Sequence, residues 1–509
     1  MRKITRTISG VTPVAVMTEP LNCPGRCIYC PTFSETPRSY TPRSPAVLRA
    51  QSCGFDAARQ VELRLKMMTS MGHPTDKIEL IVMGGTFLAY PADYQYRFIR
   101  GCYDALNGRE SKTLEEAKQL NEQAGHRCVG LCIETRPDWC GQTEIDRMLE
   151  FGATRVELGV QMLDDNVYRI VRRGHTVEDV VKATRLLREH AFKVHYHWMP
   201  GLPGSSPEKD LALSRQLFSD ERFRPDGLKI YPTMVVEGTE LEKWYKEGRY
   251  QPYPDETMTN LVADIKAIVP PYVRISRVLR DIPSQFVTGG LKDSLRDVVK
   301  QRMKQQGKEC QCIRCREYGH RVRSGQKPGE AHLVRMDYDA SGGREILLSF
   351  EDKQGTLFGL LRLRIQDNLI AGLSEATHHL HHSRESGNPE EIDNRIPNQV
   401  GNGKFSSPSA LIRELHIYGP EVPLNQHPSS LSGVEGLSSR LPGLGGQAQH
   451  KGLGKALLAE AERIARDEFG AKNMAVLSGV GAREYYRAEG GYRLQAGYMV
   501  KKLAPESEA

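Results

Sequence analysis

The features that mark a membrane or secreted protein are missing from this sequence. No apolar run approaches 18 uninterrupted residues, the length that a membrane-spanning helix needs, so we expect no membrane partner. The first residues are basic, but no apolar stretch follows them, which predicts that there is no secretory signal peptide. No segment repeats with the period of a solenoid. These absences together favour a globular protein of the cytoplasm.

The chain has 509 residues, of which 39% are hydrophobic and 26% are charged. This length exceeds what one ordinary core can organise, so we expect two or three domains. The net charge of +7 is mild, but between Lys292 and Lys327 there are 11 Lys or Arg against 4 Asp or Glu. Such a cluster suits either a phosphate backbone or a solvated helical face, and charge alone does not decide between them.

The eleven cysteines are unevenly distributed, and two groups of three stand out. The first group is Cys23, Cys27 and Cys30, and the second is Cys310, Cys312 and Cys315. In a cytosolic chain such groups indicate metal binding rather than disulfides. The remaining five have no ligand spacing and are predicted to be buried free thiols. They are Cys53, Cys102, Cys128, Cys132 and Cys140.

Short β-rich runs alternate with amphipathic segments from Val11 to about Pro283. Repeated β–α units predict an α/β fold with a parallel sheet and outer helices, here a barrel or partial barrel with active residues at the carboxyl ends of its strands. The two clearest helices are expected over Asp56–Met71 and Val177–Glu189. The expected strands are Val14–Thr18, Ile78–Met83, Val129–Glu134, Arg155–Gly159, Val194–Trp198, Gly227–Tyr231 and Val273–Arg277.

The pattern changes after this region, and we divide the chain into three domains at 1–283, 284–330 and 331–509. The middle part is a basic connector that carries the second cysteine group. In the last part we expect an antiparallel hairpin of Glu345–Phe350 and Leu357–Ile365. A strand at Leu411–Tyr418, a helix from about Gly452 to Glu468 and a strand at Met474–Leu477 should follow. A histidine-rich run at 378–382 is interpreted as part of a solvated loop rather than a metal site.

The first cysteine group has the spacing C-x3-C-x2-C and follows the first predicted strand. Three thiolates can hold three irons of a [4Fe–4S] cluster and leave the fourth iron open to chelate a small molecule. Tyr29 lies where an aromatic ring can pack beside that cofactor. A structural zinc site is the alternative, but such a site requires a fourth protein ligand, and no candidate lies nearby in the sequence.

On these residues the first part of the chain resembles the radical S-adenosylmethionine (SAM) superfamily. The resemblance implies that the backbone of Gly84 and Gly85 contacts the SAM amino group, that a carboxylate at Glu134 holds the ribose, and that Arg136 and Gln161 also line the cofactor site. It further implies that an electron from the cluster cleaves SAM, and that the resulting 5′-deoxyadenosyl radical abstracts a hydrogen atom.

The last part of the chain carries a glycine motif of the form Q-x-x-G-x-G that opens a predicted helix. The glycines let the backbone approach a pyrophosphate, and the helix N-terminus supplies free N–H groups. With its flanking strands the region resembles the GNAT acetyltransferase fold, which implies acetyl-CoA. Tyr485 and Tyr486 then lie where such enzymes place a tyrosine near the thioester, although core aromatics are the alternative. The residues assigned to the motif are Gln449, His450, Lys451, Gly452, Leu453, Gly454 and Lys455.

The combination of both halves in one chain resembles the catalytic subunit of Elongator, in its bacterial or archaeal form. That family implies formation of a carboxymethyl group on C5 of the wobble uridine, position 34, with the tRNA anticodon stem-loop as partner and acetyl-CoA as donor. Further matching stretches are Arg172–Thr176, Met199–Gly204, Lys229–Thr233, Arg280–Pro283, Arg413–Gly419 and Tyr498–Leu503. The stretch at 413–419 is the most specific. From it we assign Glu414, Leu415, His416 and Ile417 to the acetyl-CoA site, Glu414 with a catalytic role.

Two lysines at strand positions are further candidates for catalysis. Lys229 ends one predicted strand and Lys193 begins another, and a lysine there can hold an RNA phosphate or the thioester oxygen. A surface lysine is the alternative.

The second cysteine group resembles the zinc site in the family's linker, with His320 predicted as the fourth ligand. Around it, Arg314, Arg316, Arg321 and Arg323 are predicted to contact tRNA phosphates.

Two rival functions remain open at this point. A protein lysine acetyltransferase would use only the last domain and keep the cluster as a structural element. A tRNA-binding scaffold would carry a degenerate catalytic centre. Radical chemistry favours the tRNA-modifying enzyme, because C5 of uridine is not acidic and an acetyl methyl group is a poor electrophile.

Overall fold

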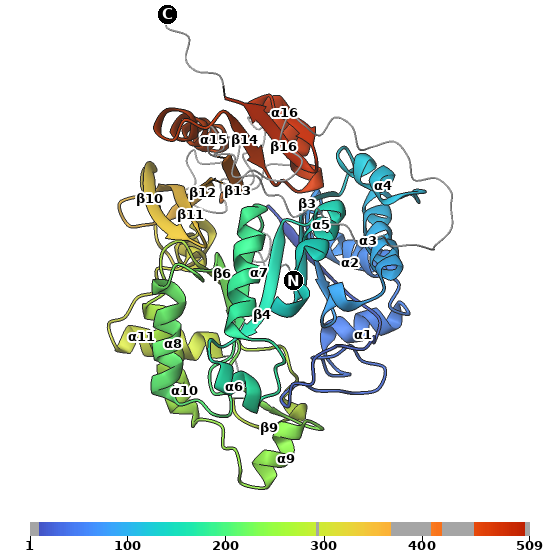
Figure 1. Cartoon of the computed structure of the whole chain (residues 1–509), viewed down its shortest axis with the longest axis vertical. Helices are drawn as coiled ribbons and strands as arrows, with labels where there is room; N and C mark the ends of the chain where they lie inside the picture. Colours follow the sequence, from blue (N-terminus) through green and yellow to red (C-terminus); the bar gives the residue numbers. More distant parts are fainter. Residues whose placement is uncertain (1–9, 292–294, 368–408, 420–451, 504–509) are drawn as a thin grey trace, which may run out of the picture.

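The computed structural model describes residues 10–291, 295–367, 409–419 and 452–503 (Figure 1). The predictions for Gln449, His450 and Lys451, and for the histidine run at 378–382, lie outside these residues. None of the helices in the described ranges is both long and apolar enough to cross a bilayer.

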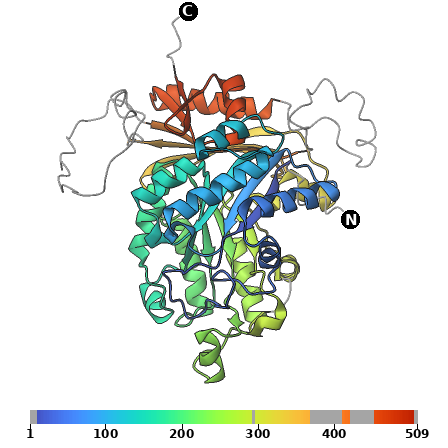
Figure 2. The same cartoon turned by 90° about the vertical axis from the view of Figure 1, so that its right-hand side faces the viewer.

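The first half is a curled parallel sheet of seven strands that pair in chain order. Figures 1 and 2 show its helices packed around the outside of the sheet. All seven predicted strands are confirmed to within two residues at each end. They are β1 (Thr12–Met17), β2 (Lys77–Met83), β3 (Arg127–Thr135), β4 (Arg155–Gln161), β5 (Lys193–Trp198), β6 (Gly227–Ile230) and β8 (Arg274–Val278).

Alternation along each strand separates an apolar outer face from a polar inner face. In β2, Ile78, Leu80 and Val82 are fully buried in the core, whereas Glu79 and Ile81 face the inside of the half-barrel. The helices of this half pack mostly on the outer face. They are α1 (Pro45–Ser52), α2 (Ala57–Ser70), α3 (Ala92–Asn107), α4 (Leu114–Asn121), α5 (Gln142–Phe151), α6 (Asp165–Ile170), α7 (Val177–Glu189), α8 (Pro207–Ser219), α9 (Glu240–Lys246) and α10 (Asp255–Ala267).

Helix α7 illustrates why these segments are helical. The Thr176 side chain and the Asp179 side chain form a reciprocal capping box at its N-terminus. Val180, Ala183 and Leu187 then fall on one buried face, at the spacing of a helix that packs against a sheet.

A connector joins the two halves. Its first strand is β9 (Val287–Gly289), which pairs with β7 (Val235–Val236) of the first half. Helix α11 (Leu295–Gln305) follows and packs on α10. Two short helices, α12 (Ile313–Arg316) and α13 (Tyr318–Arg323), complete it.

The second half is a seven-stranded mixed sheet in the order β10-β11-β12-β13-β14-β16-β15. Its hairpin, its single parallel pair of β13 and β14, and the helix that starts after Gly452 confirm the predicted elements. Its strands are β10 (His332–Ala340), β11 (Gly343–Glu351), β12 (Leu357–Gln366), β13 (Ser409–Ile417), β14 (Asn473–Val476), β15 (Arg493–Gln495) and β16 (Tyr498–Lys502), and its helices are α15 (Leu453–Arg463) and α16 (Arg483–Gly490).

Strand β10 was not predicted, and its environment explains why. It lies at the edge of the sheet with most of its side chains exposed, so the sequence lacks the alternation of buried and exposed residues that marks a strand.

The second half sits on the amino-terminal edge of the half-barrel, as both views show (Figures 1 and 2). The loop before α16 lies directly on the first residues of β3. A side chain at Gly479 would collide with the Val129 carbonyl group, and a Cβ at Gly481 would lie 2.9 Å from backbone atoms of Arg127 and Cys128. Glycine is needed at both positions because two backbones touch there.

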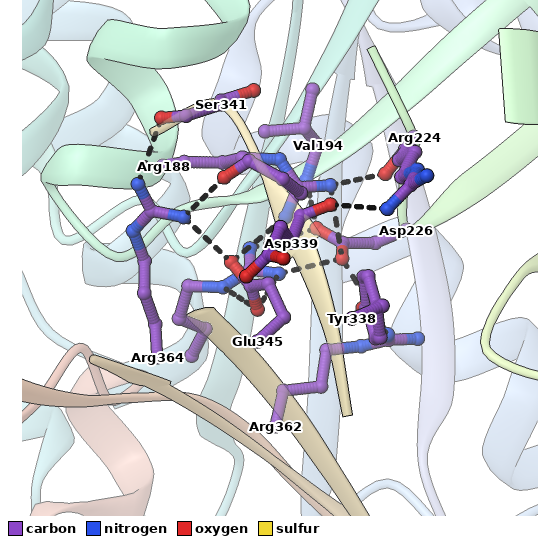
Figure 3. Close-up of polar contacts among 12 residues, drawn as sticks. Arg188, Val194, Arg224, Asp226, Tyr338, Asp339, Ser341, Glu345, Arg362 and Arg364 are labelled. Carbon is purple, nitrogen blue, oxygen red and sulfur yellow. Dashed lines mark hydrogen bonds and ion pairs between the residues drawn. The ribbon is translucent and has the colours of Figure 1, made fainter. Parts of the chain in front are cut away.

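A buried charge cluster joins the halves more firmly still. We call it the interface cluster: Arg188, Asp226, Glu345, Arg362, Arg364 and Arg413, whose side chains are 0–1% exposed. Figure 3 shows the labelled arginines and carboxylates of this cluster converging between the halves.

Arg413 makes the central contacts of the interface cluster. Its guanidinium donates to both carboxylate oxygens of Asp226, at 2.8 and 2.6 Å, and to Glu345 at 2.9 Å. Glu345 also accepts from Arg188 at 2.9 Å and from Arg364 at 3.0 Å. The two carboxylates are therefore shared among four guanidinium groups.

We expect Asp226→Asn to lower the free energy of unfolding by about 3–5 kcal/mol, because it leaves buried guanidinium groups without their shared anion. Burial would raise the pKa of Asp226, but Arg413, Arg188 and Arg362 hold it well below the ordinary range. The ionised carboxylate therefore stabilises the fold fully above the unfolded-state pKa of about 3.9, and this contribution is lost as pH falls below that value.

Chemical denaturation from pH 7 down to pH 3 tests both statements, and the wild type should lose more stability on acidification than the variant. Asp93→Asn is the control, because its side chain is 74% exposed in a surface ion pair, and it should change stability by less than about 0.5 kcal/mol. Equal effects of the two substitutions would contradict the prediction.

Candidate active site

One cavity of about 1160 Å³ is lined by both halves of the molecule. Its wall includes Cys23, Cys27 and Cys30, which follow the carboxyl edge of β1, and the inner face of the parallel sheet. It also includes Gly452, Gly454, Lys455, Tyr485 and Tyr486 of the second half, which docks at the opposite edge. The cavity therefore runs through the half-barrel from one predicted site to the other.

The cysteine loop is held by the backbone and by an arginine. Ile28 donates its N–H to Val171 and accepts a hydrogen bond from Leu241. The Arg173 guanidinium lies 3.3 Å from the Cys27 sulfur. Burial opposes ionisation of this thiol, but Arg173 lowers its pKa below the ordinary value. A thiolate, the form that ligates iron, is therefore favoured at Cys27.

The predicted cofactor residues beside these thiols carry unpaired polar atoms. Gln161 Oε1 and Arg136 Nη1 are buried and have no hydrogen-bond partner among the described residues. Both residues line the cavity, and Gln161 holds a left-handed backbone with φ of +71°. Unsatisfied buried polar atoms and strained backbone together fit a site that binds a polar ligand. Tyr29 is buried in the same wall.

The two predicted glycines differ in position. Gly84 and Gly85 have φ of +132° and +100°, which a side chain would strain. Gly85 lines the cavity, whereas Gly84 packs against Thr18 and accepts a hydrogen bond from its hydroxyl at 3.3 Å. Only Gly85 is placed to offer its backbone to a ligand in this cavity.

Four side chains form a charged row inside the half-barrel. Glu134 and Glu157 are register partners on β3 and β4, and His197 and Lys229 are register partners on β5 and β6. The Lys229 ammonium contacts Glu157 and lies 3.1 Å from Glu134. His197 Nε2 lies 3.0 Å from Glu157 Oε2. We call these four residues the lumen row.

The charges of the lumen row fix one another. Burial lowers the pKa of Lys229, but Glu157 and Glu134 outweigh it and raise the pKa well above its usual value. Burial raises the pKa of Glu157, but Lys229, His197 and Arg155 hold it well below its usual range. Glu134, Glu157 and His197 have ligand atoms within 4.8 Å of one another, yet the ammonium of Lys229 already supplies the cation there.

The sequence singled out Lys229 and Glu134 but not Glu157 or His197. The strand register could have identified them, because alternate residues along a strand face the same side of the sheet as their partners on neighbouring strands. Arg173 was also missed as a partner of the cysteine loop, although it lies in one of the matching stretches.

Lys193 and Glu414 meet where the half-barrel joins β13. Their charged atoms are 3.3 Å apart, and both side chains line the cavity. Glu414 also accepts from Arg362 at 2.8 Å. Burial raises the pKa of Glu414, but Lys193 and Arg362 hold it far below its usual range. The pairing register of β12 and β13 shifts at this point, so the strand is locally irregular beside Glu414.

The neighbouring residues of β13 also reach the cavity. Leu415, His416 and Ile417 line it. The His416 ring stacks on Tyr418 at 4.4 Å between centroids. Burial lowers the pKa of His416 to about 4, so the ring is neutral at pH 7.

The glycine motif lies at the start of α15. Gly452 caps the helix with φ of +83°, and a Cβ at Gly454 would lie 2.7 Å from the Tyr485 hydroxyl oxygen. Tyr485 is 38% exposed, and Tyr486 is buried. The half-barrel holds their helix, because Glu122 accepts from Arg483 at 3.0 Å and from Arg487 at 2.6 Å. Leu453, also assigned to the motif, is the first residue of α15.

The two cysteine groups differ in geometry. The sulfur atoms of Cys310, Cys312 and Cys315 lie within 4.8 Å of one another, close to the roughly 3.8 Å expected around one tetrahedral zinc ion. Cys23, Cys27 and Cys30 do not form such a compact set in the described part of the chain. Wider spacing suits thiolates that each bind a different iron.

Two predictions around the connector do not fit the structure. His320 does not join the compact set of sulfur atoms, and its Nε2 lies 3.7 Å from Glu317 instead. Arg316 was predicted to contact RNA, but it is 3% exposed and binds Glu351 at 2.6 Å, so that prediction is wrong. Arg314 lines the cavity rather than projecting into solvent.

Comparison with known proteins agrees with this arrangement. The model of the radical SAM superfamily matches residues 21–214, and that of the radical SAM C-terminal domain matches residues 225–305. A tRNA uridine(34) acetyltransferase of Dehalococcoides mccartyi is 62% identical over 503 residues, which cover 99% of this chain and 100% of that protein. Elongator complex protein 3 of Homo sapiens is 41% identical over 98% of this chain and 85% of its own.

A solved structure is similar along nearly the whole chain. The archaeal Methanocaldococcus infernus Elp3 with an N-terminal deletion superimposes with a TM-score of 0.78 at 42% identity. The match covers 98% of this chain and 100% of that one.

The lumen row generates a prediction about stability. Lys229→Met should lower the free energy of unfolding by about 3–5 kcal/mol, because it leaves Glu157, only 2% exposed, as a buried anion without its ammonium partner. The double variant Lys229→Met with Glu157→Gln should recover most of this loss, since neither charge then remains. Denaturant unfolding of both variants provides the measurement.

The matched control is Lys246→Met, which breaks a pair whose lysine is 67% exposed and should cost under about 1 kcal/mol. If the double variant is no more stable than the single variant, the two charges do not depend on each other in this way.

Proposed function

The chain belongs to the radical SAM family that includes the tRNA uridine(34) acetyltransferases and Elongator complex protein 3, and from that premise we propose that it forms 5-carboxymethyluridine at position 34 of tRNA. Acetyl-CoA is the proposed donor, and a SAM-derived radical is the proposed activator. The observation that carries this proposal is the single cavity shared by the cysteine loop and the glycine motif.

The residues of the half-barrel fit a [4Fe–4S] cluster and SAM. Cys23, Cys27 and Cys30 would hold the cluster, with Arg173 stabilising the Cys27 thiolate. Gly85, Arg136 and Gln161 line the cavity beside these cysteines and would contact SAM there, with the left-handed backbone at Gly85 and Gln161 shaping the site. When bound, this pair supplies a 5′-deoxyadenosyl radical that takes a hydrogen atom from the acetyl methyl group.

The residues of the second half fit a thioester. Gly452 and Gly454 would let the pyrophosphate approach the N-terminus of α15. Tyr485 and Tyr486 would lie along the pantetheine arm. Glu414 faces the cavity beside Lys193, so it is proposed to orient the water that releases CoA from the thioester. The ion pairs that hold its pKa low make it a weak base, so this role is one of positioning. Lys193, paired with Glu414, would stabilise negative charge on the thioester oxygen.

The two sites lie at opposite edges of the half-barrel, and this separation constrains the chemistry. A seven-residue strand such as β4 spans roughly 20 Å. The acetyl end of the donor must therefore extend into the lumen to meet the radical and the uridine. A protein lysine acetyltransferase has no need of such a lumen, so the shared cavity favours tRNA modification over that rival.

Cys310, Cys312 and Cys315 are proposed to bind zinc. Their compact sulfur set fits one ion, and α12 and α13 offer little core of their own, so the metal would brace this connector.

The decisive experiment is nucleoside analysis of tRNA after anaerobic incubation with SAM, acetyl-CoA and a reductant. We expect 5-carboxymethyluridine together with 5′-deoxyadenosine, and no modified nucleoside when acetyl-CoA is omitted. Acetylation of a peptide without SAM, and no change in tRNA, would instead support the rival acetyltransferase.

Metal analysis separates the two cysteine groups. Replacing Cys23, Cys27 and Cys30 by Ala should remove the iron and its absorbance but leave one zinc per chain. Replacing Cys310, Cys312 and Cys315 by Ala should remove the zinc and leave the iron. Each variant serves as the control for the other, and loss of both metals from either would show that one metal is not assigned to the right residues.

A further inference from the structure

His197 is placed unlike the other side chains of the lumen row. Its ring contacts Tyr231 edge-on at 5.3 Å, and its side chain is 15% exposed toward the cavity. Nε2 is bound to Glu157, whereas the described residues offer no hydrogen bond to Nδ1, which is not among the sealed, unpartnered atoms of the structure. One ring nitrogen is thus fixed by the protein and the other is available to a molecule in the cavity.

The partner on Nε2 determines what Nδ1 can do. Glu157 is ionised, because Lys229, His197 and Arg155 together outweigh its burial. An ionised carboxylate requires a hydrogen on the nitrogen that it contacts, so Nε2 donates, and in the neutral ring Nδ1 carries the lone pair. A carboxylate that orients a neutral imidazole and stabilises its protonated form is the arrangement of a general base.

The proposed reaction creates a need for such a base. When the acetyl-derived carbon radical adds to C5 of uracil, a carbon–carbon bond forms, C5 becomes tetrahedral and the unpaired electron moves to C6. The hydrogen on C5 is still present. To restore the C5–C6 double bond, C5 must lose a proton and the ring must lose one electron. A bound cluster that had given one electron to SAM would be the acceptor for that electron.

We propose that His197 is the base that takes the C5 proton of the target uracil through Nδ1, with Glu157 as the residue that orients it. This inference rests on the proposed function and adds an assignment within it. The C5–H electron pair becomes the new double bond, the proton passes to Nδ1, and Glu157 stabilises the imidazolium that results.

The other ionisable groups nearby are less suited to this step. Lys229 is held as an ammonium and has no lone pair to offer. Lys193 is paired with Glu414. His195, two residues earlier on β5, packs its ring over Gly227 and is only 4% exposed. Glu134 is already shared by Lys229 and the Tyr40 hydroxyl group.

The test is His197→Gln, which can still donate to Glu157 but cannot act as an imidazole base. We expect 5′-deoxyadenosine to form within about twofold of the wild-type rate, while 5-carboxymethyluridine falls by about 10²–10⁴-fold. Because the C6 radical then keeps its C5 hydrogen and can take an electron from the reductant in the assay and a proton from solvent, the expected by-product is the 5,6-dihydro form of the modified nucleoside. Deuterium placed at C5 of uridine 34 should be lost with the wild type and retained in this by-product.

His126→Gln is the matched control, since His126 binds the Thr75 carbonyl at 2.7 Å and does not line the cavity. It should leave both products unchanged. If His197→Gln does not fold, His197→Phe is the alternative variant. It keeps the aromatic contact with Tyr231, and the same products are expected from it. Full modification by either folded variant would overturn the assignment of His197.

A second measurement needs neither cofactors nor RNA. In protein labelled with ¹⁵N in its histidine rings, the signals lost in His197→Gln identify His197, and they should show the form with hydrogen on Nε2 and none on Nδ1. A hydrogen on Nδ1 at neutral pH would contradict the proposal. If wild-type protein makes no 5-carboxymethyluridine, the proposed function fails, whereas modification by a His197 variant alone refutes this inference.

Discussion

The contact between Arg413 and Asp226 is the constraint on which the rest of the molecule depends. Asp226 precedes β6 of the half-barrel, and Arg413 belongs to β13 of the second sheet, so this buried pair fixes one half against the other. The residue after Arg413 is Glu414, whose carboxylate reaches Lys193 at the start of β5. The strand that carries the proposed acetyl-CoA residues is therefore positioned by the same contact that docks the second half on the half-barrel. Such a cluster of buried charges is expensive to desolvate, and it persists because every carboxylate in it is shared.

The inner face of the half-barrel departs from the usual pattern. In closed eight-stranded barrels, branched apolar side chains fill the interior. Here the inward positions include Glu79, Arg155, Glu157 and Lys229, and the interior is a cavity. Arg155 lies against Glu79, and Lys229 lies against Glu157, so the charges are neutralised locally. A polar interior of this kind can receive a nucleobase and a thioester, which an apolar core cannot.

The sequence was sufficient for the seven parallel strands and for the cysteine groups, whose members stand close together in the chain, but not for the exposed edge strand β10. The parallel strands follow from runs of apolar residues between helical segments, and the two cysteine groups follow from spacing alone. Contacts between distant residues were beyond it: Arg188, Asp226, Glu345 and Arg413 are far apart in the chain and meet only because the second half docks on the amino-terminal edge. The wrong prediction for Arg316 has a similar cause. A count of positive charges in the sequence does not reveal that this arginine is buried against Glu351. His320 was chosen as the fourth zinc ligand because it is near the cysteines in the sequence. In the structure its ring nitrogens do not lie among the three sulfur atoms.

The position of the lumen row between the two sites explains how one chain could join two unlike chemistries. The carboxyl edge of the sheet carries the cysteine loop, where a reactive radical would arise, and the amino-terminal edge carries Glu414, where water is proposed to attack the thioester. These steps conflict, because a carbon radical must be kept from solvent while hydrolysis requires it. The interior between them is occupied by Lys229, held as an ammonium, and Glu157, held as a carboxylate, together with the His197 imidazole, which contacts Glu157 through Nε2. The acetyl methyl group and the thioester carbonyl are joined by one bond, so the donor, once bonded to the uracil, would have to move along the lumen before its thioester meets Glu414.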